Sequence, residues 1–262
     1  MKFCPLCSGS SGNCSLLSAG DANILVDAGV TAKRITELLA LIGVEMANID
    51  AIVVTHEHSD HIKGVGVLAR KYHIPVYANA DCWAQMQRYD PNIPQPSVRV
   101  FESDHPFYFM GVRIFPFSTP HDSVHSVGYT FEYDGKKCAV MTDVGHVDAR
   151  LIGILENSDL LLLEANHDVD MLNAGSYPYS LKKRILSARG HLCNEDAGLT
   201  LVRLHDKGVR NVILGHLSQE NNTKELALVT VQTVLEDAGC LDDMHIIAAE
   251  RDYPCGVFEL GA

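Results

Sequence analysis

The densest group of potential metal ligands in the chain lies in the segment His56–His61. Three imidazoles and the Asp60 carboxylate lie within six consecutive positions there, with the spacing H-x-H-x-D-H. Imidazole nitrogens and carboxylate oxygens are the usual ligands of zinc and similar divalent ions. Four such groups side by side are more than one tetrahedral ion readily uses, so the spacing indicates two metals.

The segments on either side of this cluster indicate where it lies in the fold. The preceding residues Ala51–Val54 are apolar and largely β-branched, which is typical of a buried strand. The following residues Gly64–Tyr72 are expected to form a helix despite their glycines. The cluster is therefore expected on a strand-to-helix turn, at the end of a strand of a sheet.

Four more residues of ligand type follow short apolar segments elsewhere in the chain: Asp27, His121, Asp143 and His216. An aspartate or histidine at the end of an apolar strand is costly to bury unless it is paired or coordinates a metal. His125 is an alternative to His121, but the Pro-His-Asp context favours His121. These strand ends are expected to collect into one site.

The elements that must position these residues alternate between strand-like and helix-like segments. The spacing of Ile35, Leu38, Leu39 and Ile42 predicts a helix with one apolar stripe, capped by Thr31. A tight hairpin turn is expected at 133–136. Strands are expected at 2–7, 14–18, 23–26, 74–78, 107–110, 112–117, 127–133, 137–141, 160–163, 212–214, 245–248 and 256–260, and further helices at 81–89, 178–188, 194–205 and 223–238.

This pattern predicts an α/β fold with much antiparallel strand, in which two sheets pack face to face with helices outside. No linker, charge run or repeat divides the chain, so residues 1–262 are expected to form one domain. The apolar runs are too short to span a bilayer, and the first residues lack a signal-peptide hydrophobic region. We therefore expect a cytoplasmic protein with no membrane partner.

Composition limits the possible chemistry further. The eight cysteines, including a C-x-x-C at Cys4–Cys7, are expected to be buried or free thiols. The formal net charge of −12 argues against general electrostatic binding of nucleic acid over the whole surface. Bound divalent ions would reverse the sign of the field locally, so the charge does not exclude a nuclease.

The order of these candidate ligands resembles the motifs of the metallo-β-lactamase-fold hydrolases. The resemblance implies a four-layer αββα sandwich with a dinuclear metal site along one edge. It also implies that Asp27 orients a ligand imidazole from behind. By the same resemblance, His56, His58 and His121 hold one ion, Asp60, His61 and His216 hold the other, and Asp143 bridges both. Zinc is the expected metal, with manganese or iron as alternatives for the mixed second site.

The chain resembles most closely the YycJ/WalJ branch of this superfamily, which is related to ribonuclease Z and is exonuclease-like. The resemblance implies that His191 protonates the leaving oxygen or holds a phosphate. The residues expected to act in catalysis are then Asp60, Asp143 and His191. The segments that carry the resemblance are Ser8–Cys14, Pro120–Asp122, Thr142–Gly145, Glu164–Asp168 and Gly190–Asn194.

Two of these segments contain candidate substrate-binding residues. The loop Ser8–Asn13 is either a flexible turn or a backbone nest for a phosphate, with Ser10, Ser11 and Asn13 beside the substrate. Asn166 and His167 follow a buried apolar run and are expected to line the site or only to support it.

The function expected from these residues is two-metal phosphodiester hydrolysis on nucleic acid, at a single-stranded end or on DNA. Two ions about 3.5–4 Å apart would share a bridging hydroxide that attacks phosphorus. The alternative is a small-molecule hydrolase on the same scaffold, acting on a cyclic phosphodiester, thioester or lactone. A non-enzymatic binding protein is disfavoured by the complete ligand set. The sequence leaves the oligomeric state and the physiological substrate open.

Overall fold

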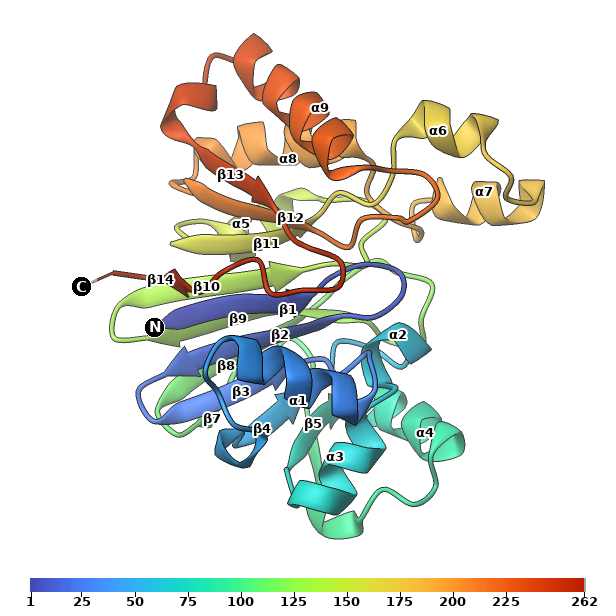
Figure 1. Ribbon diagram of the computed structural model, residues 1–262. Helices are drawn as coiled ribbons and strands as arrows, with labels where there is room; N and C mark the ends of the chain where they lie inside the picture. The colour runs from blue at the N-terminus through green and yellow to red at the C-terminus, as the bar shows by residue number, and fades with distance from the viewer. Residues whose placement is uncertain (262) are drawn as a thin grey trace.

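The computed structural model describes residues 1–261 and contains two seven-stranded β-sheets packed face to face, with helices on both outer faces (Figure 1). These four layers confirm the αββα sandwich expected from the sequence. Among residues 1–261, no helix is both long and apolar enough to cross a membrane. All eight cysteines fall within this range and are free thiols, as expected.

The first sheet contains the N-terminal strands and one strand from the C-terminus. Its strand order is β14-β1-β2-β3-β4-β5-β6. Pairing is antiparallel from β14 to β3 and parallel from β3 to β6. The strands are β1 (Lys2–Cys7), β2 (Cys14–Ala19), β3 (Ala22–Val26), β4 (Ala51–Val53), β5 (Val76–Asn79), β6 (Val98–Phe101) and β14 (Phe258–Glu259). Its helices are α1 (Ala32–Leu41), α2 (Ser59–Ile62), α3 (Val65–Tyr72) and α4 (Ala80–Tyr89).

The second sheet repeats this plan. Its order is β13-β12-β11-β10-β9-β8-β7, antiparallel from β7 to β10 and parallel from β10 to β13. The strands are β7 (Phe107–Phe109), β8 (Val112–Ser118), β9 (Val127–Tyr133), β10 (Lys136–Met141), β11 (Leu160–Glu164), β12 (Asn211–Gly215) and β13 (His245–Ala248). Its helices are α5 (Ala149–Leu155), α6 (Val169–Ala174), α7 (Tyr179–Ile185), α8 (Asn194–His205) and α9 (Lys224–Asp237). Short 3-10 turns lie at Met46–Asn48, Gln95–Ser97 and Leu241–Asp243.

Local sequence signals account for several of these elements. Helix α1 buries Ile35, Leu38 and Leu39 on one face, and the Thr31 side chain accepts a hydrogen bond from the Arg34 amide, as the predicted cap requires. The β9–β10 turn has φ of +50° at Asp134 and +70° at Gly135. Positive φ at both central residues is the type I′ geometry that matches the twist of a tight hairpin.

A core between the two sheets joins the halves of the molecule. It contains side chains of both sheets, with Phe3 and Ile24 from the first and Tyr129 and Phe131 from the second. The Tyr129 hydroxyl donates a 2.5 Å hydrogen bond to the Val54 carbonyl, at the end of β4. The core therefore fixes the strand end that leads into the histidine cluster relative to the opposite sheet.

The helix predicted over 178–188 is shorter in the structure, where α7 ends at Ile185. The following residues turn back toward the sheets, and the His191 amide donates to the Ile185 carbonyl over 3.0 Å. Helices α6 and α7 project from the same edge of the sandwich as α2 (Figure 1). This edge is where the candidate ligands gather.

Candidate metal centre

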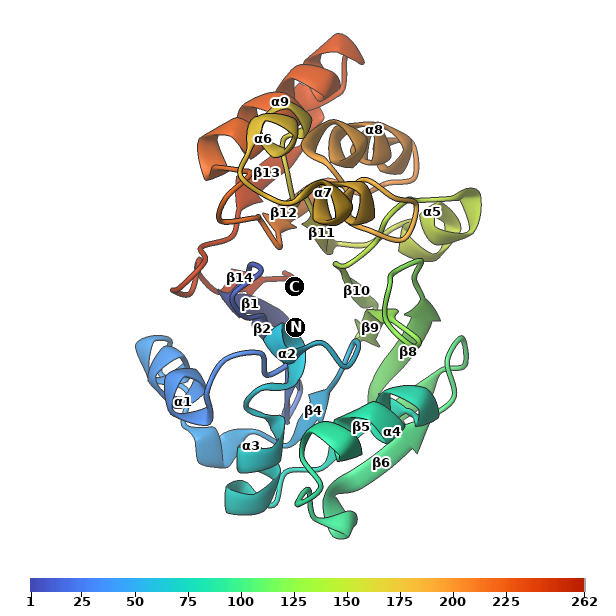
Figure 2. The same ribbon diagram turned by 90° about the vertical axis from the view of Figure 1, so that its right-hand side faces the viewer.

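The ends of strands from both sheets meet at one edge of the sandwich, between α2 and α7 (Figure 2). Three residues that follow these strands have a left-handed backbone, with φ of +62° at Asp27, +55° at Asp143 and +56° at His216. Such a conformation costs roughly 1–3 kcal/mol for a residue other than glycine and is concentrated at functional sites. The surrounding fold holds the chain in this conformation at these positions.

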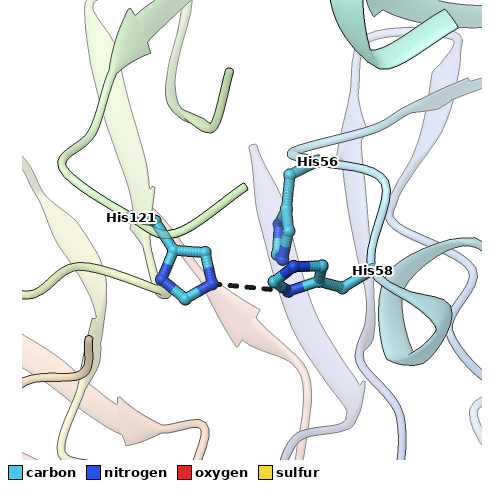
Figure 3. Close-up of side chains that lie close together, drawn as sticks. All are labelled: His56, His58 and His121. Atoms are coloured by element: carbon cyan, nitrogen blue, oxygen red, sulfur yellow. Dashed lines mark hydrogen bonds between the residues drawn. The ribbon is translucent and has the colours of Figure 1, made fainter. Parts of the chain in front are cut away.

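One group of ligand atoms joins the two halves of the chain. His56 and His58 come from the turn after β4, and His121 comes from the loop after β8 (Figure 3). One ring nitrogen of each lies within 4.8 Å of the others, and His58 Nδ1 is 3.4 Å from His121 Nε2. Two ligands of one tetrahedral ion at about 2.1 Å from it would be about 3.4 Å apart, so this spacing fits a shared cation.

A second group lies beside the first. Asp60 Oδ2 is 3.5 Å from His61 Nε2 and 3.6 Å from His216 Nε2. Asp60 and His61 lie on α2, whereas His216 follows β12 in the other sheet. This group too has the spacing of ligands around one ion.

The Asp143 carboxylate lies between the two groups. Its Oδ1 is 3.7 Å from His121 Nε2 and 3.5 Å from His216 Nε2, and its Oδ2 is 3.3 Å from His61 Nε2. Asp143 is 2% exposed. One carboxylate therefore faces imidazoles of both groups, which is the geometry required of a bridging ligand.

Four of the imidazoles have an oxygen acceptor next to Nδ1 and present Nε2 to the centre. A histidine that ligates a metal usually donates its other ring N–H in this way, which fixes the tautomer and the ring orientation. Thr55 can accept this bond because its own hydroxyl donates to Asp27 over 2.9 Å. The pairs are His56 with Thr55 Oγ1 (3.0 Å), His61 with Asp27 Oδ2 (2.8 Å), His121 with the Gly190 carbonyl (3.1 Å) and His216 with Glu164 Oε1 (2.7 Å).

Several atoms at the centre are buried without a hydrogen-bond partner. They include His56 Nε2, His216 Nε2 and Asp143 Oδ2. A buried lone pair without a partner costs free energy unless a donor or a cation satisfies it. Burial, followed by the neighbouring imidazoles, also lowers the pKa of His56 well below its usual value, which favours the neutral ring, the form that can coordinate a metal. The donor set therefore fits divalent metal ions.

Sequence reasoning missed the part played by Glu164. This residue is fully buried, and its Oε1 accepts hydrogen bonds from His216 Nδ1 over 2.7 Å and from His191 Nδ1 over 2.8 Å. Burial acts to raise the pKa of Glu164, but the charges and hydrogen bonds of the two histidines hold that pKa well below its usual range. The available signal was a carboxylate at the end of the apolar run Leu160–Leu163, the same feature that singled out Asp27.

His191 lies at the rim of the centre. Its side chain is 19% exposed, and its Nδ1 is 3.8 Å from Asp143 Oδ1 as well as hydrogen-bonded to Glu164. Burial acts to lower the pKa of His191, but the charge and hydrogen bond of Glu164, together with the charge of Asp143, raise that pKa above its usual value. His191 is therefore partly open to solvent at the centre, and its contact with a substrate stays a prediction.

The loop after β1 lies against the second group. Ser10 and Ser11 are exposed at its tip. Asn13 is buried, accepts a hydrogen bond from the Gly9 amide, and has its Nδ2 3.1 Å from His61 Nε2. Substrate contact by these three residues stays a prediction, and their loop borders the ligands.

Asn166 and His167 lie beneath the centre, 4% and 1% exposed. Asn166 Nδ2 donates to the His216 carbonyl over 2.8 Å, so it supports a ligand loop. Direct substrate contact by either residue stays a prediction, and their burial argues against it. His125 lies outside the ligand groups, where its ring contacts Ser118 Oγ at 3.1 Å.

This sandwich, with ligand groups at one edge, defines a protein of the metallo-β-lactamase fold. Residues 22–217 match the family model described as "Beta-lactamase superfamily domain". Among solved structures, the metallo-beta-lactamase fold protein YhfI from Bacillus subtilis superposes with a TM-score of 0.74, covering 99% of this chain and 100% of that protein at 20% identity.

Relatives of known name agree over most of the chain. Exodeoxyribonuclease WalJ of Streptococcus pneumoniae is 45% identical over 239 residues, which cover 90% of this chain and 89% of that protein. Exodeoxyribonuclease YycJ of Bacillus anthracis is 41% identical over 239 residues, covering 91% and 90%. The chain therefore belongs to the beta-lactamase superfamily, in the branch that contains WalJ and YycJ.

Proposed function

We propose that this protein is a dinuclear metal-dependent phosphodiesterase that degrades DNA from an end. The observation that carries the proposal is the pair of ligand groups that share Asp143. Two ions held close together suit the in-line displacement at phosphorus. The names of relatives at 41–45% identity support DNA as the substrate.

In this proposal, the seven ligands divide as the family resemblance implied. His56, His58 and His121 would hold one ion, Asp60, His61 and His216 would hold the other, and Asp143 would be shared by both. When bound, the ions supply Lewis-acid activation of water and of a phosphoryl oxygen. Zinc is the first choice because four imidazoles present Nε2, with manganese or iron as alternatives for the carboxylate-containing site.

The protein's own groups then orient and transfer protons. Glu164 accepts a hydrogen bond from His191 Nδ1 over 2.8 Å, which leaves the Nε2–H of a protonated ring free to donate its proton to the departing oxygen. Because the Glu164 charge favours the protonated imidazole, His191 is suited to act as the general acid. Asp60 and Asp143 would help to hold the ions at the substrate phosphate.

A substrate panel with defined metals tests this proposal. Single-stranded DNA, duplex DNA, RNA, bis-p-nitrophenyl phosphate and a glutathione thioester are each incubated with metal-loaded protein and with chelated protein. We expect DNA shortened from an end, with loss of activity on chelation. Thioester turnover with inert nucleic acids would instead support the small-molecule hydrolase.

Asp143→Ala is the matching variant, because it removes the one carboxylate that faces both groups. We expect it to lose bound metal and to lower the DNA cleavage rate at least 100-fold, by analogy with metal-site losses of that size. Asp21→Ala changes an exposed carboxylate in the β2–β3 turn, at the opposite end of the sheet, and is the control. Full metal content and full rate in Asp143→Ala would contradict the bridging role.

A further inference from the structure

The segment from α6 to the loop before His191 differs in charge from the rest of the chain. Residues 169–190 contain four of the 21 lysines and arginines but only one of the 33 aspartates and glutamates. They carry a net charge of +3 in a chain of −12, so the remaining residues together carry −15. An anionic ligand near the metal centre would meet its most favourable protein charges on this segment.

A pocket with a volume of about 620 Å³ lies on this segment, outside the metal centre. It is lined by Asn173, Tyr179, Lys182, Lys183, Leu186 and Ser187. Tyr179 is 81% exposed and Leu186 is 46% exposed, so the pocket offers an aromatic ring and an aliphatic side chain to solvent. An exposed ring next to cationic side chains is the combination by which proteins bind single-stranded nucleic acid.

The two lysines of the pocket differ in how firmly their side chains are held. Lys182 Nζ is fixed by hydrogen bonds of 2.7 Å to the Asn173 and Gly175 carbonyls, so its charge has a defined position. Lys183 is exposed, and within residues 1–261 no carboxylate forms an ion pair with it. By contrast, Arg184 forms an ion pair with Asp122, so its charge is already balanced.

Helix α7 and the loop that follows it connect the pocket to the metal centre. Helix α7 leads from Tyr179 to Ile185, and the His121 ring is hydrogen-bonded to the Gly190 carbonyl a few residues later. At a rise of 1.5 Å per residue, the six steps along α7 span about 9 Å, or about three nucleotides at the 3.4 Å spacing of stacked bases in one strand. In Figure 2, α7 and α2 both face the viewer, α7 beside the second sheet and α2 beside the first.

We propose that this α7 pocket binds a nucleotide of single-stranded DNA that extends from the phosphate held at the metal centre, with the base stacked on Tyr179 and the backbone phosphate next to Lys183. This inference rests on the proposed function. It also requires an unpaired strand at this position, because a base still inside a duplex has no free face for Tyr179. The substrate near the cleavage point is therefore a single strand.

Binding of a fluorescein-labelled, phosphorothioate-linked single-stranded oligonucleotide to the metal-loaded protein tests the pocket. Loss of one stacked base lowers affinity by about 5- to 150-fold, so Tyr179→Ala is expected to raise Kd at least 5-fold, whereas Tyr179→Phe retains the ring and the affinity. Lys183→Ala is expected to weaken binding and to reduce the slope of log K against log salt by about 0.7. Duplex DNA without a single-stranded end is expected to respond much less to either variant.

Matched controls lie at the other end of the sandwich. Tyr108, in β7, is 71% exposed, and Lys207, next to Glu156, has a side chain that is 51% exposed. Tyr108→Ala and Lys207→Ala are expected to bind the oligonucleotide as the unchanged protein does. If the unchanged protein cleaves DNA but Tyr179→Ala and Lys183→Ala bind the oligonucleotide as well as it does, the pocket proposal is wrong and the proposed function stands. An unchanged protein that neither binds nor cleaves DNA overturns the proposed function.

Discussion

Four of the five imidazoles at the centre have their orientation fixed by an oxygen acceptor next to Nδ1. Asp27 supplies that acceptor for His61, and both of its oxygens are already engaged by Thr55: Oδ1 with the amide and Oδ2 with the hydroxyl. The predicted supporting contact of Asp27 is thus present. Because Asp27 and His61 are almost fully buried, water cannot substitute for a missing acceptor there.

Asp27→Asn tests this dependence. The asparagine oxygen would face the Thr55 amide, and its NH₂ group would then face His61 Nδ1. His61 would have to accept on Nδ1 and carry its proton on Nε2, so it would no longer ligate a metal. We expect the metal content to fall from about two ions per chain toward about one, measured by inductively coupled plasma mass spectrometry. Asp21→Asn is the control, and two retained ions in Asp27→Asn would contradict the tautomer argument.

Glu164→Gln tests the corresponding support of the other sheet. Glu164 Oε2 accepts from the Val144 and Leu192 amides, so a glutamine must place its NH₂ group either against these two donors or against His191 and His216. Changes at such outer partners typically cost 10–100-fold in metal affinity. We expect a loss of about that size in a chelator competition titration. Glu156→Gln is the control, because the Glu156 side chain is 44% exposed in the native protein, and it should keep the native metal affinity. An unaltered metal affinity in Glu164→Gln would show that Glu164 does not support the site.

The two carboxylates also show what could be predicted residue by residue. The candidate ligands could be selected from the sequence because H-x-H-x-D-H is local and the other candidates each follow an apolar strand; the structure brings these residues together. The role of Glu164 depends on His191 and His216, which lie 27 and 52 positions further along the chain. The fold alone brings such distant side chains together, so spacing in the sequence did not reveal the pairing.

At the scale of elements, the strands and the longer helices followed from apolar periodicity and caps, whereas the short helices did not. Helix α5 has seven residues and α6 has six, too few for a clear period. Each nevertheless begins at an aspartate cap, Asp148 or Asp168, whose side chain accepts an amide hydrogen bond. After α7, the Arg189 side chain donates to the His121 carbonyl and the His121 ring contacts the Gly190 carbonyl; periodicity does not reveal such long-range contacts.

Three loops of the first sheet are linked by backbone hydrogen bonds behind the ligands. The Asn13 amide donates to the Asp60 carbonyl, and the Gly29 amide donates to the Asn13 carbonyl, each over 2.8 Å. A Cβ at Gly29 would lie 1.6 Å from the Asp60 carbonyl oxygen and 2.6 Å from the Asn13 nitrogen. Only glycine allows this close approach of the loops.

Gly29→Ala is therefore expected to displace Asp60 and to weaken the second ligand group. Overpacking of this kind costs about 1–3 kcal/mol, which corresponds to a fall in Tm of roughly 2–12 °C for a chain of this size. Gly153→Ala is the matched control, because Gly153 lies in α5 and a Cβ there meets nothing within 4 Å. It should leave Tm unchanged or raise it slightly. Equal Tm and metal content in the two variants would contradict the close-packing argument.

At the scale of the whole molecule, the ligands divide between the two sheets. His56, His58, Asp60 and His61 belong to the first sheet and its connections, and His121, Asp143 and His216 follow strands of the second. The general plan of two sheets was predictable from the alternation of elements. The way in which the two sheets pack on each other was not predictable, because side chains of the inter-sheet core such as Phe3 and Tyr129 are far apart in the sequence. Bound ions would act as a clamp across this interface, in addition to the apolar core.

This arrangement predicts a large effect of metal removal on global stability. A ligand that binds only the folded state adds about 4 kcal/mol when its free concentration is a thousandfold above Kd, which corresponds to roughly 8–16 °C in Tm. We expect chelation to lower Tm by that amount in scanning fluorimetry and readdition of zinc or manganese to restore it. Asp143→Ala should show a much smaller shift, since it lacks the carboxylate that faces both groups. If the native chain keeps its Tm after verified removal of metal, the two halves are held together by the inter-sheet core alone and the ions serve only catalysis.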